Sequence, residues 1–147
     1  MLKNRVKDEM VAAMKGGDKR RLGAIRLLLA AIKQREVDER IELDDTQVLV
    51  VLDKMVKQRR DSIEQYEKAG RTELAEQEAF EISLLQEFLP AALSDAEIDV
   101  LIDQAIVSTG ATSIKDMGRV MGKIKPQAQG RADLGEVSVR VKAKLSG

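Results

Sequence analysis

The sequence has 147 residues, of which 34% are charged, and its 25 Lys and Arg balance its 25 Asp and Glu. It contains no cysteine and no histidine, which excludes disulfides, thiolate nucleophiles, imidazole bases and the most common zinc and haem ligands. With two prolines and three aromatic residues, Tyr66, Phe80 and Phe88, the composition predicts a helical protein with an aliphatic core.

The charges are unevenly distributed along the chain. Residues 1–35 carry ten Lys and Arg against three Asp and Glu, whereas residues 36–87 carry seven against fifteen. Residues 88–114 carry none against four, and residues 115–147 carry eight against three. Two interpretations fit this pattern: oppositely charged helices that pack on one another, or basic faces that bind an anionic partner.

The sequence shows no sign of a membrane span. Its longest uncharged apolar run, from Leu27 to Ile32, is far shorter than the roughly 20 residues that a span requires. The first residues mix Lys3 and Arg5 with Asp8 and Glu9 and lack a signal-type apolar segment. We therefore expect a cytoplasmic protein that makes no membrane contact.

Residues 1–35 are predicted to form two amphipathic helices. The first covers residues 2–15 and ends at Gly16 and Gly17, and Asp18 caps the second. The second helix carries six positive charges, for which a solvated surface is the first interpretation. The predicted core positions are Leu2, Val6, Met10, Ala13 and Met14 in the first helix and Leu22, Ile25, Leu28, Leu29 and Ile32 in the second.

Two further helices are predicted before residue 90. The helical signal fades over Glu36 to Glu42, and Asp44 or Asp45 then caps a long third helix that runs to Gly70. Thr72 is expected to cap a fourth helix, which ends before Pro90. The predicted core positions are Val48, Val51, Leu52, Met55, Ile63 and Tyr66 in the third helix and Ala75, Ala79, Ile82, Leu85, Phe88 and Leu89 in the fourth.

Three shorter helices are predicted in the remainder. Ser94 and Glu97 form a capping box for a fifth helix that ends near Gly110, and Ser113 with Asp116 caps a sixth. Pro126 and Gly130 are expected to break the chain before a seventh helix that Asp133 and Glu136 cap. The sequence thus predicts an all-α fold, with a four-helix N-terminal domain at 1–90 and a three-helix C-terminal bundle at 91–147.

The sequence contains no pattern typical of a catalytic or metal site. Metal-ligand spacings, phosphate-binding glycine loops and nucleophile elbows are missing, and the carboxylates are scattered along helix faces and caps. We expect no catalytic residue, no metal and no cofactor, and no enzymatic activity of the chain in isolation.

The stretch from Ser113 to Asp133 gives the best functional lead. Lys115, Arg119 and Lys123 are four residues apart, which places them on one helix face, and further cations follow. Two glycines in the same helix leave a strip of bare backbone, against which either a neighbouring helix or an RNA or peptide backbone would lie. The candidate nucleic-acid-binding residues are Lys115, Arg119, Lys123, Lys125 and Arg131, and the close-approach glycines are Gly118 and Gly122.

Three segments of the sequence resemble the GatB/YqeY family of small helical proteins. They are AAMKGGDKRRLGAIRLLLAAIK, then KQRRDSIEQYEKAGR followed by LAEQEAFEISLLQEFLP, and KDMGRVMGKIKPQAQGRAD. The C-terminal part of the family is similar to the tail domain of the GatB subunit of the tRNA-dependent amidotransferase. The resemblance implies an N-terminal helical domain without catalytic chemistry and a tail-like domain associated with the folded body of tRNA.

The leading hypothesis is a non-catalytic accessory protein that binds tRNA or another folded RNA, or that is associated with translation. With so few aromatic residues, stacking on splayed bases is largely excluded, so the phosphate backbone and the shape of the RNA would be recognised. One alternative is a component linked to carbon-nitrogen ligase activity, with glutamine as amido-N-donor, through a partner of the amidotransferase machinery. The other is a protein-protein interaction adaptor that uses the acidic middle of the chain and the long third helix.

Overall fold

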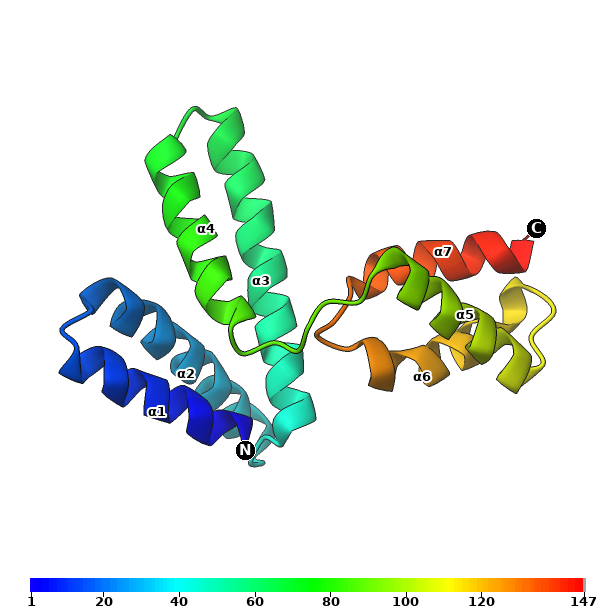
Figure 1. Cartoon of the computed structure of the whole chain (residues 1–147), viewed down its shortest axis with the longest axis horizontal. Helices are drawn as coiled ribbons and strands as arrows, with labels where there is room; N and C mark the ends of the chain where they lie inside the picture. Colours follow the sequence, from blue (N-terminus) through cyan, green and yellow to red (C-terminus); the bar gives the residue numbers. More distant parts are fainter. Residues whose placement is uncertain (147) are drawn as a thin grey trace. The chain divides into compact units, whose positions relative to one another are not determined.

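The computed structural model describes residues 1–146, and among them every regular element is a helix (Figure 1). The predicted all-α class is confirmed. The chain forms two compact units, Met1–Leu89 and Pro90–Gly147, called here the N-terminal and C-terminal units. The elements are α1 (Leu2–Lys15), α2 (Lys19–Glu39), α3 (Asp45–Lys68), α4 (Thr72–Gln86), α5 (Asp95–Thr109), the 3₁₀ turn η1 (Ile114–Asp116), α6 (Met117–Ala128) and α7 (Leu134–Ser146).

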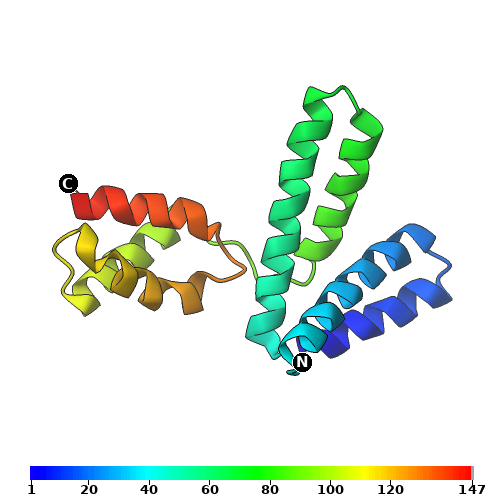
Figure 2. The ribbon, with the colours of Figure 1, turned by 180° about the vertical axis from the view of Figure 1, so that it is seen from behind.

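The N-terminal unit consists of two antiparallel helical hairpins, α1–α2 and α3–α4 (Figure 1, Figure 2). Gly17 and Gly70 lie in the two turns with φ of 69° and 71°, a left-handed conformation that glycine adopts without steric cost. In both views the hairpins meet at the ends opposite these turns and diverge toward the turns.

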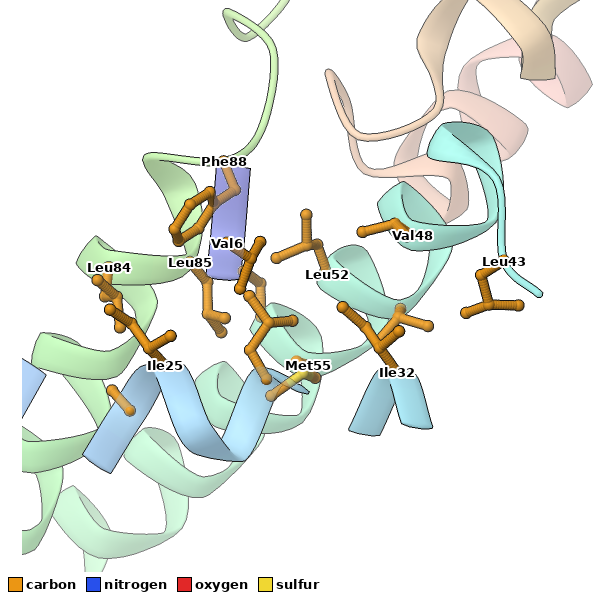
Figure 3. Packing of buried hydrophobic residues seen from close by; sticks show 14 of the residues in the cluster. Val6, Ile25, Ile32, Leu43, Val48, Leu52, Met55, Leu84, Leu85 and Phe88 are labelled. Atoms are coloured by element: carbon orange, nitrogen blue, oxygen red, sulfur yellow. The ribbon is translucent and has the colours of Figure 1, made fainter. Parts of the chain in front are cut away.

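The hydrophobic core of the N-terminal unit lies where the hairpins meet (Figure 3). Val6 of α1, Ile25 of α2, Leu52 of α3 and Leu85 of α4 are each at most 1% exposed. Phe88, two residues after the end of α4, packs into the same cluster. One apolar stripe from each helix thus closes this core, as helical periodicity predicts.

Some predicted core positions lie outside this cluster. Met14 is 52% exposed and Ala79 is exposed, so both predictions are wrong, while Ile63 and Tyr66 are only half-buried. Beyond Val56 no residue of α3 is buried, and within the N-terminal unit this part of α3 runs beside α4 without a second layer of helices (Figure 1). Periodicity located the apolar stripe, but the divergence of the hairpins decided how much of it is covered.

Charged side chains also connect the helices of the N-terminal unit. The guanidinium of Arg21 donates to Glu9 of α1 at 2.9 Å and to Glu87, just after α4, at 2.8 Å, and these bonds, Glu87 first, raise its pKa. Arg59 of α3 donates to Glu81 of α4 at 3.0 Å. These cations stabilise the packing of the helices and are engaged inside the fold.

Helix α2 is longer than the sequence predicted, because it continues to Glu39 through part of the acidic stretch. Glu36 accepts a hydrogen bond from Lys3 Nζ at 2.7 Å and another from the backbone N–H of Leu43 at 2.8 Å. Arg40 ends the helix in the left-handed conformation, with φ of 56°. Contacts with α1 and with the following loop thus hold a segment whose own helical signal is weak.

In the C-terminal unit, α5 and α7 pack against α6. Ile102, Val120, Ile124, Val137 and Val141 are each at most 1% exposed and form the centre of its core. The capping box predicted at the start of α5 is present: the N–H of Glu97 donates to Ser94 Oγ at 3.2 Å and the N–H of Ser94 donates to Glu97 Oε1 at 3.1 Å.

Pro126 does not end the sixth helix as predicted. It lies inside α6, which continues to Ala128. A proline costs its helix one backbone N–H donor and crowds the carbonyl four residues earlier, which here belongs to Gly122. The helix nevertheless gains its next bond, from the N–H of Gln129 to the carbonyl of Lys125 at 2.9 Å, and the chain turns only at Gly130, where φ is 76°.

Candidate nucleic-acid interface

The predicted binding residues lie on α6 and on the turns at its two ends. Lys115 belongs to η1 and not to α6, so the regular face predicted for three cations contains only Arg119 and Lys123 within one helix. Lys125 lies further along α6, and Arg131 follows the helix. The first four are exposed and Arg131 is half-buried.

Arg119 is held by a carboxylate at the start of α6. Asp116 accepts backbone N–H bonds from Thr112 at 3.0 Å and Ser113 at 3.4 Å, and it also pairs with the guanidinium of Arg119. The bond from Thr112, and next that from Arg119, lowers the pKa of Asp116. The charge of Arg119, whose side chain is 63% exposed, is therefore partly compensated.

Arg131 has a structural contact of its own. Its Nε donates to the carbonyl of Ala91 at 2.9 Å, and its carbonyl accepts the N–H of Leu93 at 2.8 Å. Both bonds hold the segment before α5 against the turn after α6. Arg131 therefore links these two segments of the C-terminal unit. The terminal nitrogens of its guanidinium are not used in these two bonds.

Lys115, Lys123 and Lys125 remain without such partners. Within residues 1–146 none of the three makes an ion pair or a side-chain hydrogen bond, and all three are exposed. Taking these amines from water to an anion therefore breaks no interaction within the described chain. These three side chains form the free part of the predicted cationic surface.

The glycine strip of α6 is open. Gly118 and Gly122 are exposed, and a Cβ atom built on either would meet no heavy atom within 4 Å. The expectation that a neighbouring helix packs against this strip is therefore wrong. The neighbouring helices contact the opposite face of α6 through Val120, Met121 and Ile124. Helical periodicity places Gly122 on the outer face, between Arg119 and Lys123 on one side and Lys125 on the other.

Two other cations of the C-terminal unit, Arg140 and Lys144, connect α7 to α5. Arg140 donates to Asp95 at 2.6 Å, and Lys144 donates to Asp103 at 2.7 Å. The bond to Asp95 is the main cause that raises the pKa of Arg140. The sequence contained a signal for this ladder, because Asp95, Asp99 and Asp103 recur every four residues on α5, as do Arg140 and Lys144 on α7.

A shallow hollow of 360 Å³ lies beside Arg131. Leu93, Val100 and Leu101 give it an apolar lining, and the polar groups come from Glu97, Gln127 and Arg131. Among residues 1–146, no group of three or more Asp and Glu is placed to hold a metal ion. No helix in that range is long and apolar enough to cross a membrane.

The model of the Yqey-like protein family matches residues 3–145, which is almost the entire chain. The chain belongs to the Yqey-like protein family. This confirms the family resemblance inferred from its three sequence segments.

Three fungal relatives share the name altered inheritance of mitochondria protein 41, mitochondrial. The Lachancea thermotolerans protein is 35% identical over 69% of this chain and 56% of its own length. The Eremothecium gossypii protein is 37% identical over 68% and 55%, and the Kluyveromyces lactis protein is 34% identical over 81% and 66%. The chain thus spans between half and two thirds of the length of these relatives.

The names of these relatives contradict the prediction of a cytoplasmic protein, because they describe mitochondrial proteins. The prediction had rested on a missing apolar segment. An apolar segment indicates insertion into a membrane. Transport into a compartment depends on a targeting signal, which the composition of a folded domain does not encode.

Proposed function

We propose that this Yqey-like protein is a non-catalytic accessory protein of translation that binds tRNA or another folded RNA through α6 and the turn before it. One observation carries the proposal: three exposed cations without a partner, Lys115, Lys123 and Lys125, lie beside an open strip of helix backbone at Gly118 and Gly122. Phosphate contacts supply most of the affinity of proteins for nucleic acids.

The other two candidate residues have supporting roles in this proposal. Arg119 is oriented by Asp116 and can share its guanidinium with a phosphate, while Arg131 offers the nitrogens that are not used in its bond to Ala91.

The N-terminal unit contains both phenylalanines, and each ring lies under an arginine, Phe88 under Arg5 and Phe80 under Arg20. The C-terminal unit has no aromatic residue. This surface would therefore recognise the phosphate backbone and the shape of the RNA and would not stack on its bases.

The proposal is tested by tRNA binding in a salt series. Replacing Lys115, Lys123 and Lys125 together by Gln removes three phosphate contacts, so the slope of log affinity against log salt should fall by about 2.7 for a base-paired RNA. A matched control replaces three exposed cations of α3, Lys54, Lys57 and Arg60, by Gln and should keep the slope. If the unaltered protein fails to retain tRNA at low salt, the proposed function is wrong.

A second candidate is a protein-interaction adaptor. The outer part of the α3–α4 hairpin favours it, because Ile63 and Tyr66 are only half-buried there and exposed charges such as Glu64, Glu67 and Arg71 surround them. A partner that stays bound after nuclease treatment and at high salt would support this candidate. A role in a carbon-nitrogen ligase complex is the third candidate, and failure to co-purify with any component of such a ligase would count against it.

A further inference from the structure

A second set of exposed cations lies on α2, in the N-terminal unit. Lys19, Arg26 and Lys33 recur every seven residues, close to two helical turns, so they share one face of the helix. All three are exposed, and within residues 1–146 none makes an ion pair or a side-chain hydrogen bond. We call these three residues the α2 cation row.

The other cations of α2 are engaged with neighbouring groups. Arg20 lies over the ring of Phe80, 4.0 Å from its centroid, and its Nε donates to Gln77 at 3.2 Å. Arg21 binds Glu9 and Glu87, and Arg35 pairs with Glu39. The fold thus separates the cations of one helix into those that hold the unit together and those of the row.

The α2 cation row lies in a stretch of positive charge, and the side chains between its cations are small. No acidic residue occurs from Lys19 to Arg35. Beyond the row, Glu36 is bound by Lys3 and also attracts Lys33 without forming an ion pair with it, and Asp38 accepts a hydrogen bond from Gln34. The residues between the cations on this face are Gly23 and Ala30, both exposed. A Cβ atom at Gly23 would meet nothing within 4 Å, so no packing requirement explains a glycine inside this helix.

We propose that the α2 cation row binds the phosphate backbone of a folded RNA, as a second contact surface besides α6. This inference rests on the proposed function and extends it to the N-terminal unit. Successive cations lie about 10.5 Å apart along the helix axis, and the small side chains between them let a backbone approach. An anionic bilayer fits this face less well, because interfacial helices insert a continuous face of bulky apolar residues. Gly23 and Ala30 provide none, and the exposed bulky apolar side chains of α2 are Leu27 and Val37.

The first experiment compares salt dependence in the full chain. K19Q/R26Q/K33Q should weaken tRNA binding at low salt, and its affinity should fall about 40-fold less than that of the parent between 50 and 200 mM salt, as expected for three lost phosphate contacts. The control K54Q/K57Q/R60Q removes as many exposed cations from α3 and should behave as the parent. Circular dichroism and urea unfolding of each variant check that the fold is kept.

The second experiment uses the lack of cysteine in the chain. A single cysteine at Ala30, which lies between Arg26 and Lys33 on the exposed face, is labelled with a photocrosslinker. Irradiation with tRNA should give a crosslinked product, and a cysteine at the exposed Gln58 of α3 should give little. Excess unlabelled tRNA should suppress the product at Ala30.

The outcomes separate this inference from the proposed function. If the parent binds tRNA, K115Q/K123Q/K125Q loses affinity and K19Q/R26Q/K33Q keeps the parental slope, the row is not a contact surface and α6 is. If the parent binds no tRNA, both fail. Binding of the parent to vesicles of phosphatidylcholine and phosphatidylserine that depends on the row, without row-dependent tRNA binding, would also overturn the inference in favour of a membrane surface.

Discussion

Helices α2 and α6 are built alike but lie in different surroundings. Each buries one apolar stripe, centred on Leu28 in α2 and on Ile124 in α6. On the opposite face each exposes cations, together with one glycine in α2 and two in α6. Helix α2 is packed by three other helices of its unit, whereas α6 is packed by two helices and a 3₁₀ turn. The comparison shows that a basic helix can be central to a fold and still offer free charges on its outer face.

The largest expected effect comes from the buried stripes. Leu28→Ala and Ile124→Ala each remove a side chain that is at most 1% exposed and should each lower the free energy of unfolding of the surrounding unit by about 3 kcal/mol. We propose that the two units are domains that unfold independently, with the boundary at residue 90.

This prediction has a simple optical readout. Tyr66 is the sole tyrosine and the sequence has no tryptophan, so tyrosine fluorescence reports on the N-terminal unit alone, while far-ultraviolet circular dichroism reports on both. Leu28→Ala should shift the urea transition seen by fluorescence, and Ile124→Ala should shift a transition that fluorescence does not detect. If both variants shift the fluorescence transition equally, the chain unfolds as one domain.

The exposed glycines give a smaller effect of opposite sign. Gly23→Ala in α2, and Gly118→Ala and Gly122→Ala in α6, place a methyl group in open space. The changes at Gly23 and Gly122 should each stabilise their unit by about 1 kcal/mol, because a glycine in a helix interior costs that much relative to alanine. Gly118→Ala should stabilise less, because Gly118 lies in the first turn of α6. Urea unfolding measures the gain.

Stability and binding are expected to move in opposite directions in these glycine variants. If the open backbone serves close approach, the Gly118→Ala and Gly122→Ala proteins should be more stable and bind tRNA more weakly. Unchanged tRNA affinity in the more stable variants would show that the strip is not used for contact, while the lysines beside it could still be.

The smallest effect concerns acid stability. The pKa of Glu36 in α2 is lowered, mainly by its bond to Lys3, and that of Asp116 before α6 is lowered, mainly by the N–H of Thr112. Since a lowered pKa means that the unfolded chain binds more protons, both carboxylates stabilise the fold above their ordinary values of 4.5 and 3.8, and the contribution is lost as the pH falls below them.

The two carboxylates should respond differently to removal of their basic partner. Lys3→Gln removes the main cause at Glu36 and should flatten the pH dependence of unfolding of the N-terminal unit below about pH 4.5. Arg119→Gln leaves the backbone bonds of Asp116 in place, so the acid sensitivity of the C-terminal unit should be largely retained. Equal flattening in both units would contradict this assignment of causes.

Sequence patterns by themselves determined the helical elements of this protein. Apolar spacing located the buried stripes, and the capping residues Ser94 and Glu97 fixed the start of α5, because both signals act within a few residues of chain. The local rules failed where distant contacts intervene: α2 extends through Glu36 because Lys3 holds that residue, and Met14 is exposed because the hairpins diverge at its position.

The candidate site was predictable as a set of residues but not as a surface. The sequence named Lys115, Lys123 and Lys125 together with Arg119 and Arg131, which look equivalent in composition. Only the tertiary structure shows that Asp116 compensates Arg119 and that Arg131 is bonded to Ala91, 40 residues earlier. Likewise, the partners of Arg21 are 12 and 66 residues away. Helix formation follows from the spacing of apolar residues along a short stretch of chain. Whether a basic side chain is available for binding depends on carboxylates and carbonyls that folding brings to it from elsewhere in the chain.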